Sequence, residues 1–345
     1  MHKDREALPQ IGVPSYYWGS NCIHSSMFAN CTSHGRCSTS FPSGPNQAAT
    51  FDRSILRQLA TVVGLETRAG FNLGNFTDDG LNGMGLDCWG PVINMNRDPR
   101  WGRNAEGGTE DPFLMGQLAE AWTNGLQKGD GREPRFTQVA VTLKHFDANS
   151  LDGGAKGERG LTRNTVSANI SKYMLADYYW PAFKAGIRNA DAKGVMCSYN
   201  AVNGVPTCAD PLMRAAREAF LSPFPCHTQP GLNNTNWQAW NFTGYVTSDS
   251  DAVGDIWASH HYKPTAAAAS CAAVAEGGCD IDSGNTFNDG LMEGVKQGLC
   301  PMASVDQRLA NTFRIRMELG LFDPIEDQVR VTPCRRTVLA VLLSC

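Results

Sequence analysis

The chain has 345 residues, 42% of them hydrophobic, so it can bury a sizeable core as one large α/β barrel or as two ordinary domains. Its net charge of -4 and its isoelectric point near 6.0 give no basic field for nucleic acid or for a membrane surface, so neither partner is expected. No apolar stretch approaches the roughly 20 residues that a membrane-spanning helix needs.

Along the chain, short apolar segments that predict buried strands alternate with longer amphipathic segments that predict helices. The strand candidates are residues 85–94, 139–145, 194–200, 245–249 and 279–282. The helix candidates are residues 52–69, 112–126, 167–188, 211–220, 264–275 and 304–319. This order predicts a parallel sheet with helices outside it, either doubly wound or closed into an eight-fold barrel. No Gly-x-Gly-x-x-Gly opens a helix after a strand, which disfavours a dinucleotide-binding sheet.

A charged segment follows the first strand candidate. Arginines alternate there with acidic residues, a composition that suits forked hydrogen bonds to carboxylates and hydroxyls. We expect Arg97, Asp98 and Arg100 to form a salt-bridged loop. Arg103 is the better candidate ligand, and Trp101 is a candidate platform for the face of a sugar.

Polar side chains stand at the ends of three later strand candidates. Lys144 and His145 end the second, Tyr199 lies near the end of the third, and Asp249 ends the fourth. A lone Lys-His pair is more often a surface pair than a site. The carboxyl ends of barrel strands converge on one face, however, so together these residues predict one pocket.

Asp249 is the most informative of these residues. A buried strand that ends at a carboxylate can deliver it for attack on carbon or for binding a polyol. Two simpler interpretations remain, a solvated turn or the first ligand of a cation-binding loop, because Asp251 and Asp255 are close in sequence.

Twelve cysteines and several Asn-x-Ser/Thr sequons predict a glycosylated, extracellular or secretory-pathway protein. The sequons are at Asn30, Asn75, Asn169, Asn233 and Asn241. The cysteines are scattered, which argues against a zinc site, and their pairing is left open. Residues 1–6 are charged and lack the apolar region of a signal peptide, so we expect the true start upstream; the alternative is that the sequons occur by chance.

Five sequence runs carry a family resemblance. The runs are GPVINMNRDPRWGRNAEGGTEDP, LKHF, VMCSYNAVNGVPTCADP, GYVTSDSDAV and RLANTFRIRMELGLFDP. In order and spacing the chain resembles glycoside hydrolase family 3, and most its β-xylosidase branch. The resemblance implies a (β/α)8 TIM-type barrel as the first domain, in residues 1–324. Residues 325–345 are then a short tail, either the start of an interdomain linker or an aberrant C-terminus.

The resemblance also implies an activity and its residues. The resemblance implies an exo-acting retaining β-glycosidase that needs no cofactor. Its expected substrates are oligosaccharides, or aryl and alkyl β-glycosides, from which it would remove terminal β-D-xylosyl or β-D-glucosyl residues. Asp249 is then the nucleophile, and Met196 packs near the first sugar subsite. The hydroxyl-binding residues are Arg103, Lys144, His145 and Tyr199, together with Asn21, which stands in the early sugar-binding loop where the family commonly has an acidic residue.

Departures from the family pattern lead to two further expectations. The family's acid/base Glu comes from an α/β sandwich domain after the barrel, so we expect this chain to lack that domain and to be impaired. Glu106, Glu110 and Asp111 belong to the charged loop and are not assigned as proton donors. The early sugar-binding loop lies close to Met1, so we expect the first barrel elements to be missing.

Two alternative functions stay open. One is a single-domain β-N-acetylglucosaminidase, which is disfavoured because residues 147–150, rather than a Pro-Gly-His type of turn, follow LKHF. The other is a non-catalytic sugar-binding or truncated barrel.

Overall fold

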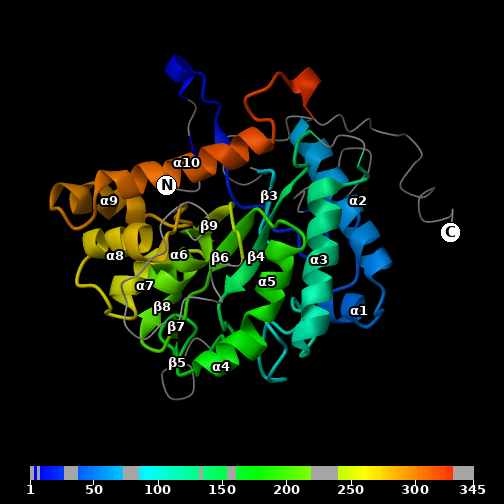
Figure 1. The fold of residues 1–345 in the computed structure, drawn as a ribbon, viewed down its shortest axis with the longest axis horizontal. Coiled ribbons are helices and arrows are strands. Elements are labelled where there is room, and N and C mark those ends of the chain that lie inside the picture. The colour runs from blue at the N-terminus through cyan, green and yellow to red at the C-terminus, as the bar shows by residue number, and fades with distance from the viewer. Residues whose placement is uncertain are drawn as a thin grey trace.

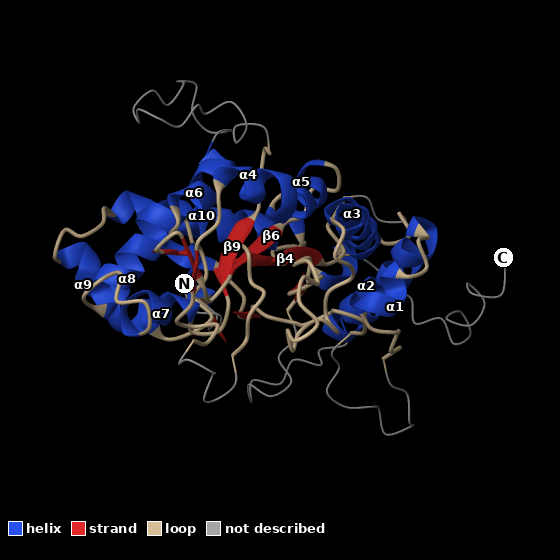
Figure 2. Ribbon diagram, turned by 90° about the horizontal axis from the view of Figure 1, so that it is seen from below, coloured by secondary structure: helices blue, strands red, loops and turns tan. Residues whose placement is uncertain are grey.

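The computed structural model describes residues 4–5, 8–26, 38–72, 85–131, 135–153, 161–218 and 240–328. Its centre is a sheet of parallel strands, and helices lie around these strands (Figures 1 and 2). The strands, in their order across the sheet, are β3 (Asp87–Cys88), β4 (Ala140–Phe146), β6 (Gly194–Cys197) and β9 (Tyr245–Ser248). All of their residues are buried, as expected for a parallel sheet covered on both faces.

The predicted α/β class is confirmed, but the sheet does not close into an eight-stranded barrel within the described residues. One parallel bridge extends each edge, from Ser20 to Cys88 and from Thr247 to Ile281. The early segment β2 (Tyr16–Tyr17) instead pairs antiparallel with β1 (Asp4–Arg5). The sequence offers only five buried strand-like segments, and residues 279–282, the last of them, contribute a single bridge.

The helices surround the sheet, some of them packed on other helices (Figure 2). In chain order they are α1 (Gly44–Ala48), α2 (Arg53–Asn72), α3 (Pro112–Lys128), α4 (Lys172–Met174), α5 (Pro181–Arg188), α6 (Pro211–Glu218), α7 (Ala252–Ala258), α8 (Ala266–Ala272), α9 (Thr286–Lys296) and α10 (Met302–Glu318). Figure 2 shows α1 to α3 on one side of the strands and α7 to α9 on the other. A small separate sheet joins β5 (Ser167–Ala168), β7 (Ala201–Val202) and β8 (Val205–Pro206).

One helix prediction was wrong, and helices α1, α7 and α9 were not predicted. The helix expected over residues 167–188 begins as strand β5 and contains a π-helical segment, Leu175–Tyr179, before Pro181 starts α5. Helix α9 was missed because glycine lowers helix propensity. Its Gly290 is needed for packing, since a Cβ there would lie 2.7 Å from the Ala266 carbonyl carbon in α8.

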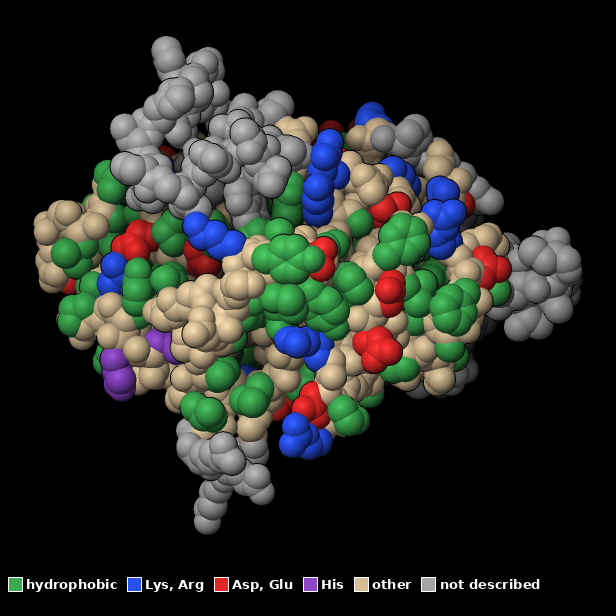
Figure 3. Space-filling view, turned by 60° about the horizontal axis from the view of Figure 1, so that its bottom comes forward, with side chains coloured by type: hydrophobic (Ala, Val, Ile, Leu, Met, Phe, Trp, Pro, Cys, Tyr) green, Lys and Arg blue, Asp and Glu red, His purple; other side chains and the backbone are tan. Residues whose placement is uncertain are grey.

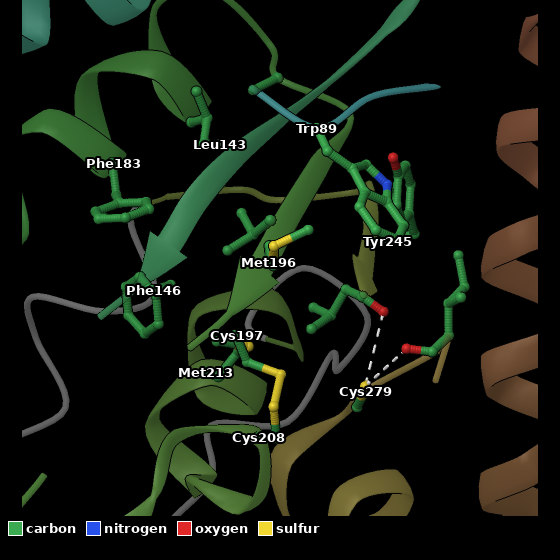
Figure 4. Packing of buried hydrophobic residues seen from close by; sticks show 14 of the residues in the cluster. Trp89, Leu143, Phe146, Phe183, Met196, Cys197, Cys208, Met213, Tyr245 and Cys279 are labelled. Atoms are coloured by element: carbon green, nitrogen blue, oxygen red, sulfur yellow. Dashed lines mark hydrogen bonds between the residues drawn. A yellow bond between two sulfur atoms is a disulfide. The ribbon is translucent and has the colours of Figure 1, made fainter. Parts of the chain in front are cut away.

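The core holds three disulfides among the described residues. They join Cys22 to Cys88, Cys197 to Cys208 and Cys271 to Cys300, while Cys279 is buried and reduced. Figure 4 shows the Cys197–Cys208 pair beside Met196 and Met213 in this core. The second disulfide therefore lies next to the strand end that carries Met196.

The surface is mixed in character. On the face drawn in Figure 3, acidic and basic side chains are interspersed with hydrophobic ones. No helix in the described part of the chain is long and apolar enough to cross a membrane.

Candidate active site

The carboxyl ends of β4, β6 and β9 open into one cavity of about 580 Å³. It is lined by Asn21, Ile23, His24, Ser25, Trp89, Arg103, Glu106, Lys144, Asp152, Arg163, Met196, Tyr199, Asp249 and Ser250. Six of the seven predicted site residues are in this set. The seventh, His145, contacts the cavity residue Asp249, so the structure brings all seven together.

Asp249 directly follows β9 and is 9% exposed. Its backbone N–H donates to the Cys197 carbonyl at 3.0 Å, which ties it to β6. Its Oδ1 accepts the Ser250 N–H at 2.8 Å, while Oδ2 is buried without a hydrogen-bond donor in the described part of the chain. The carboxylate is therefore fixed in place with one oxygen left for a ligand.

His145 is positioned by Asn94. The Asn94 Oδ1 accepts the His145 backbone N–H at 2.8 Å, and the Asn94 Nδ2 donates to the His145 carbonyl at 2.9 Å. The same Oδ1 lies 3.1 Å from Nδ1 of the imidazole. Burial, with the charges of Arg103, Lys144 and Arg163, holds the pKa of His145 well below its usual value. We assign the neutral tautomer with the proton on Nδ1, which leaves an acceptor at Nε2.

Lys144 is buried and donates from Nζ to Oδ1 of Asn21 at 2.9 Å. Burial lowers the pKa of Lys144 to about 8, against the opposing effect of the Asp249 charge. At neutral pH the ammonium is therefore charged, and it can donate to hydroxyl groups as well as to Asn21.

Two ion pairs complete the polar lining. Arg103 makes a forked pair with Glu106, with both N–O distances 2.8 Å. Burial raises the pKa of Glu106, but the hydrogen bonds and the charge of Arg103 lower it by more, so the pKa of Glu106 is below its usual value. Arg163 lies 3.7 Å from Asp152. The cavity thus contains charges of both signs, which suits a polyhydroxylated, uncharged ligand.

Tyr199 and Met196 come from β6 and the turn after it. Burial and the Asp249 charge raise the pKa of Tyr199, so its hydroxyl stays protonated. Met196 is 1% exposed and gives the cavity part of its apolar lining. Together they offer one hydrogen-bonding group and one apolar contact.

Sequence reasoning missed four of the residues that shape this cavity, Asn94, Trp89, Asp152 and Arg163. Trp89, Asp152 and Arg163 belong to no motif that marks them as site residues. Asn94 lies in the sequence run GPVINMNRDPRWGRNAEGGTEDP. Trp101 was the wrong choice of aromatic residue, because its side chain is buried and does not line the cavity. The tryptophan that lines the cavity is Trp89.

The salt-bridged loop expected of Arg97, Asp98 and Arg100 is confirmed for Asp98 and Arg100. Arg100 pairs with Asp98 on the surface, at 2.6 Å, and Arg97 stacks on the ring of Tyr178. Neither arginine lines the cavity.

The cation-loop interpretation is not supported. Asp255 bonds to Nδ2 of Asn164 at 2.7 Å, and Asp251 is exposed at the start of α7. No group of three or more His, Cys, Asp or Glu side chains in the described ranges could hold a metal ion.

The predicted sequons are only partly described. Asn169 and Asn241 are exposed, as a glycosylation site must be. Asn30, Asn75 and Asn233 lie outside the described residues, as does most of the predicted tail after residue 328.

Comparison with known proteins places this cavity in a family context. The sequence matches the Glycosyl hydrolase family 3 N terminal domain over residues 27–315. It is 37% identical over 327 residues to a probable exo-1,4-beta-xylosidase (bxlB) of Aspergillus clavatus, and 35% identical over 325 residues to a probable beta-D-xylosidase 7 of Arabidopsis thaliana. These alignments cover 93% and 92% of this chain, but only 38% of each relative's length.

Solved structures give the same picture. A GH3 exo-beta-xylosidase (XlnD) in complex with a xylobiose aziridine activity-based probe matches with a TM-score of 0.77 and 27% identity, over 94% of this chain and 39% of that one. A mutant beta-glucosidase from Listeria innocua in complex with laminaribiose matches with a TM-score of 0.65 and 28% identity, over 84% of this chain and 35% of that one.

Proposed function

Because the chain belongs to glycosyl hydrolase family 3, we propose that it acts as a retaining exo-β-glycosidase on terminal β-D-xylosyl or β-D-glucosyl residues. Its substrates are then oligosaccharides of plant-type polysaccharides, or aryl and alkyl β-glycosides. Relatives named as probable β-xylosidases favour xylose as the preferred sugar. The three disulfides and two exposed sequons support an extracellular or secretory-pathway location.

The observation that carries this proposal is the position of Asp249. Its buried Oδ2 lies 3.4 Å from Nε2 of His145, in a cavity that also contains Lys144 and Arg103. Lys144 and Arg103 bring positive charge into the cavity that holds this carboxylate. A carboxylate fixed in this way among hydroxyl-binding groups is the arrangement that a glycosyl-enzyme mechanism needs.

In the proposed reaction, an Asp249 oxygen attacks the anomeric carbon as the bond to the leaving oxygen breaks. The leaving oxygen takes a proton, and the sugar remains as an ester on Asp249. A water molecule then attacks the same carbon and breaks the ester bond, which releases the sugar with retained configuration and restores the carboxylate. The proton that this water loses replaces the one taken by the leaving oxygen. Lys144 and Arg103 donate to sugar hydroxyls, and the neutral His145 accepts from one through Nε2.

The proton donor is a separate requirement. A second, protonated carboxyl group should protonate the leaving oxygen. Glu106 is poorly suited, because its ion pair with Arg103 keeps its pKa low. We assign no described cavity residue to this role, and we expect slow turnover of this chain on glycosides with poor leaving groups.

The test is covalent trapping. The protein is incubated with 2-deoxy-2-fluoro β-xyloside or β-glucoside carrying dinitrophenolate, a leaving group that departs without a proton. We expect a stoichiometric gain in intact mass, located by peptide mapping to Asp249, and faster labelling by the sugar that fits. A folded protein that gains no mass with either reagent would contradict the proposal and favour a non-catalytic sugar-binding role.

A further inference from the structure

Tyr199 is held from two sides, and one of them is the side chain of Arg163. The Arg163 guanidinium carbon lies 4.4 Å from the centre of the Tyr199 ring. On the other side, Nε2 of His260 lies 2.7 Å from the Tyr199 backbone carbonyl. The backbone and the ring of this tyrosine are thus fixed by different elements.

Arg163 is itself fixed at both its backbone and its side chain. Its backbone N–H donates to the Asp152 carbonyl at 2.9 Å, and its guanidinium lies 3.7 Å from the Asp152 carboxylate. The next residue, Asn164, donates to Asp255 of α7 at 2.7 Å. These contacts hold the guanidinium over the ring, whereas a free arginine would sample many rotamers.

The stacked tyrosine lies where the reaction is proposed to occur. Tyr199, Arg163 and Asp249 line the same cavity. The charge of Asp249 acts on the Tyr199 hydroxyl, and the charge of Arg163 acts on both Tyr199 and His145. A shift of the Tyr199 ring would therefore change the surroundings of the carboxylate and move the Tyr199 hydroxyl, while the other hydroxyl-binding groups of the cavity stay in place.

We propose that Arg163, anchored by Asp152, is a positioning residue that holds the Tyr199 ring beside Asp249. This rests on the proposed glycosyl transfer to Asp249. A cation over an aromatic ring stabilises it modestly, and small displacements near a reacting centre reduce rate more than binding. Loss of Arg163 should therefore slow glycosylation of Asp249 while leaving sugar affinity nearly unchanged.

The first measurement is the kinetics of trapping by the fluorinated xyloside. Arg163→Met should lower the maximal labelling rate by about tenfold, with less than about a threefold change in the half-saturating concentration. Arg163→Lys keeps the charge but loses the flat guanidinium, so it should fall between wild type and Arg163→Met. Arg188→Met, at an exposed position of α5, is the matched control and should behave as wild type.

The second measurement does not depend on turnover. In protein labelled with ¹³C-tyrosine, the Tyr199 ring resonance is assigned by its loss in Tyr199→Phe. Arg163→Met should shift this resonance with little change in those of the other tyrosines and in the melting temperature, and Arg163→Lys should shift it less.

The two measurements separate the possible failures. Failure of the fluorinated xyloside to label the wild-type protein would overturn only the glycosidase proposal. The Tyr199 resonance would still report whether Arg163 positions the ring. Unchanged labelling and an unchanged Tyr199 resonance in Arg163→Met would overturn the positioning role. A general loss of stability that also shifts the other tyrosine resonances would equally overturn it, since it would indicate a structural role only.

Discussion

Nε2 of His145 lies 3.4 Å from Oδ2 of Asp249, and both atoms are hydrogen-bond acceptors. The orientation of Asn94 leads to this conclusion, because its Oδ1 accepts the His145 backbone N–H and must also accept the proton on Nδ1. Two facing acceptors repel unless a donor lies between them. A ligand hydroxyl would supply that donor, so the site is better satisfied when it is occupied.

This geometry predicts that Asp249→Asn will abolish labelling without harming the fold. The amide can donate its N–H to Nε2 of His145, which removes the repulsion, so the melting temperature should be unchanged or higher. The rate of mass gain with the fluorinated xyloside should fall by at least about a thousandfold, because an amide is not a nucleophile here. The matched control is Asp251→Asn, two residues away, exposed and in a left-handed conformation that asparagine tolerates. Normal labelling of Asp249→Asn would rule out Asp249 as the nucleophile.

The sequence located these two residues for a simple reason. Each follows or ends a short apolar strand, and strand ends in a parallel sheet share one edge, so their proximity was predictable from order alone. Asn94 and Arg163 were not predictable in this way. Asn94 contacts His145 across 51 positions, and Arg163 reaches Tyr199 from a segment with no strand or helix signal.

The fold was predictable to a similar depth. Strands β4, β6 and β9 follow from their apolar runs, whereas closure depends on pairings between distant edges that no local pattern encodes. Helix α9 shows the same limit, since the packing that favours Gly290 against Ala266 is visible only in three dimensions.

The lowered pKa of Lys144 predicts opposite effects of pH on labelling and on stability. Labelling should decline as pH rises through about 8, because the ammonium that donates to hydroxyls and attracts Asp249 loses its charge. Stability moves the other way. Between about pH 8 and the usual lysine pKa near 10.4 the unfolded chain binds the proton and the folded chain does not, so this residue's contribution rises with pH.

The variant Lys144→Met measures both effects. It should lose most labelling, yet at pH 7 it should be more stable than wild type by up to a few kcal/mol in chemical denaturation. That advantage should vanish as pH approaches about 10.4. Lys184→Met, at an exposed lysine of α5, should show neither trend. A difference between wild type and Lys144→Met that does not vary with pH would contradict the buried ammonium.

Asn21→Asp should raise the pH at which labelling declines, which is the basic limb of the profile of labelling rate against pH. The substitution puts a carboxylate at the position of Oδ1, 2.9 Å from Nζ of Lys144, and a close negative charge favours the ammonium. We expect a shift of about one pH unit or more, measured as labelling rate against pH. Asn21→Ser, which keeps a neutral acceptor, serves as the control and should leave the limb near pH 8. An unmoved limb in Asn21→Asp would show that another group titrates there.

The Cys197–Cys208 disulfide should support both stability and the site, because Cys197 lies between Met196 and the turn that carries Tyr199. Replacing both cysteines by serine should lower the free energy of unfolding by about 2–4 kcal/mol.

The double serine variant at Cys271 and Cys300 is the comparison, since that pair closes a longer loop, with a sequence separation of 29 against 11, and neither cysteine lines the cavity. It should lose at least as much stability, yet label at the wild-type rate well below its melting temperature. The variant at Cys197 and Cys208 should label more slowly even when fully folded, because the strand end beside Tyr199 is no longer tied to Cys208. Equal labelling by the two variants would mean that this disulfide stabilises the fold without ordering the site.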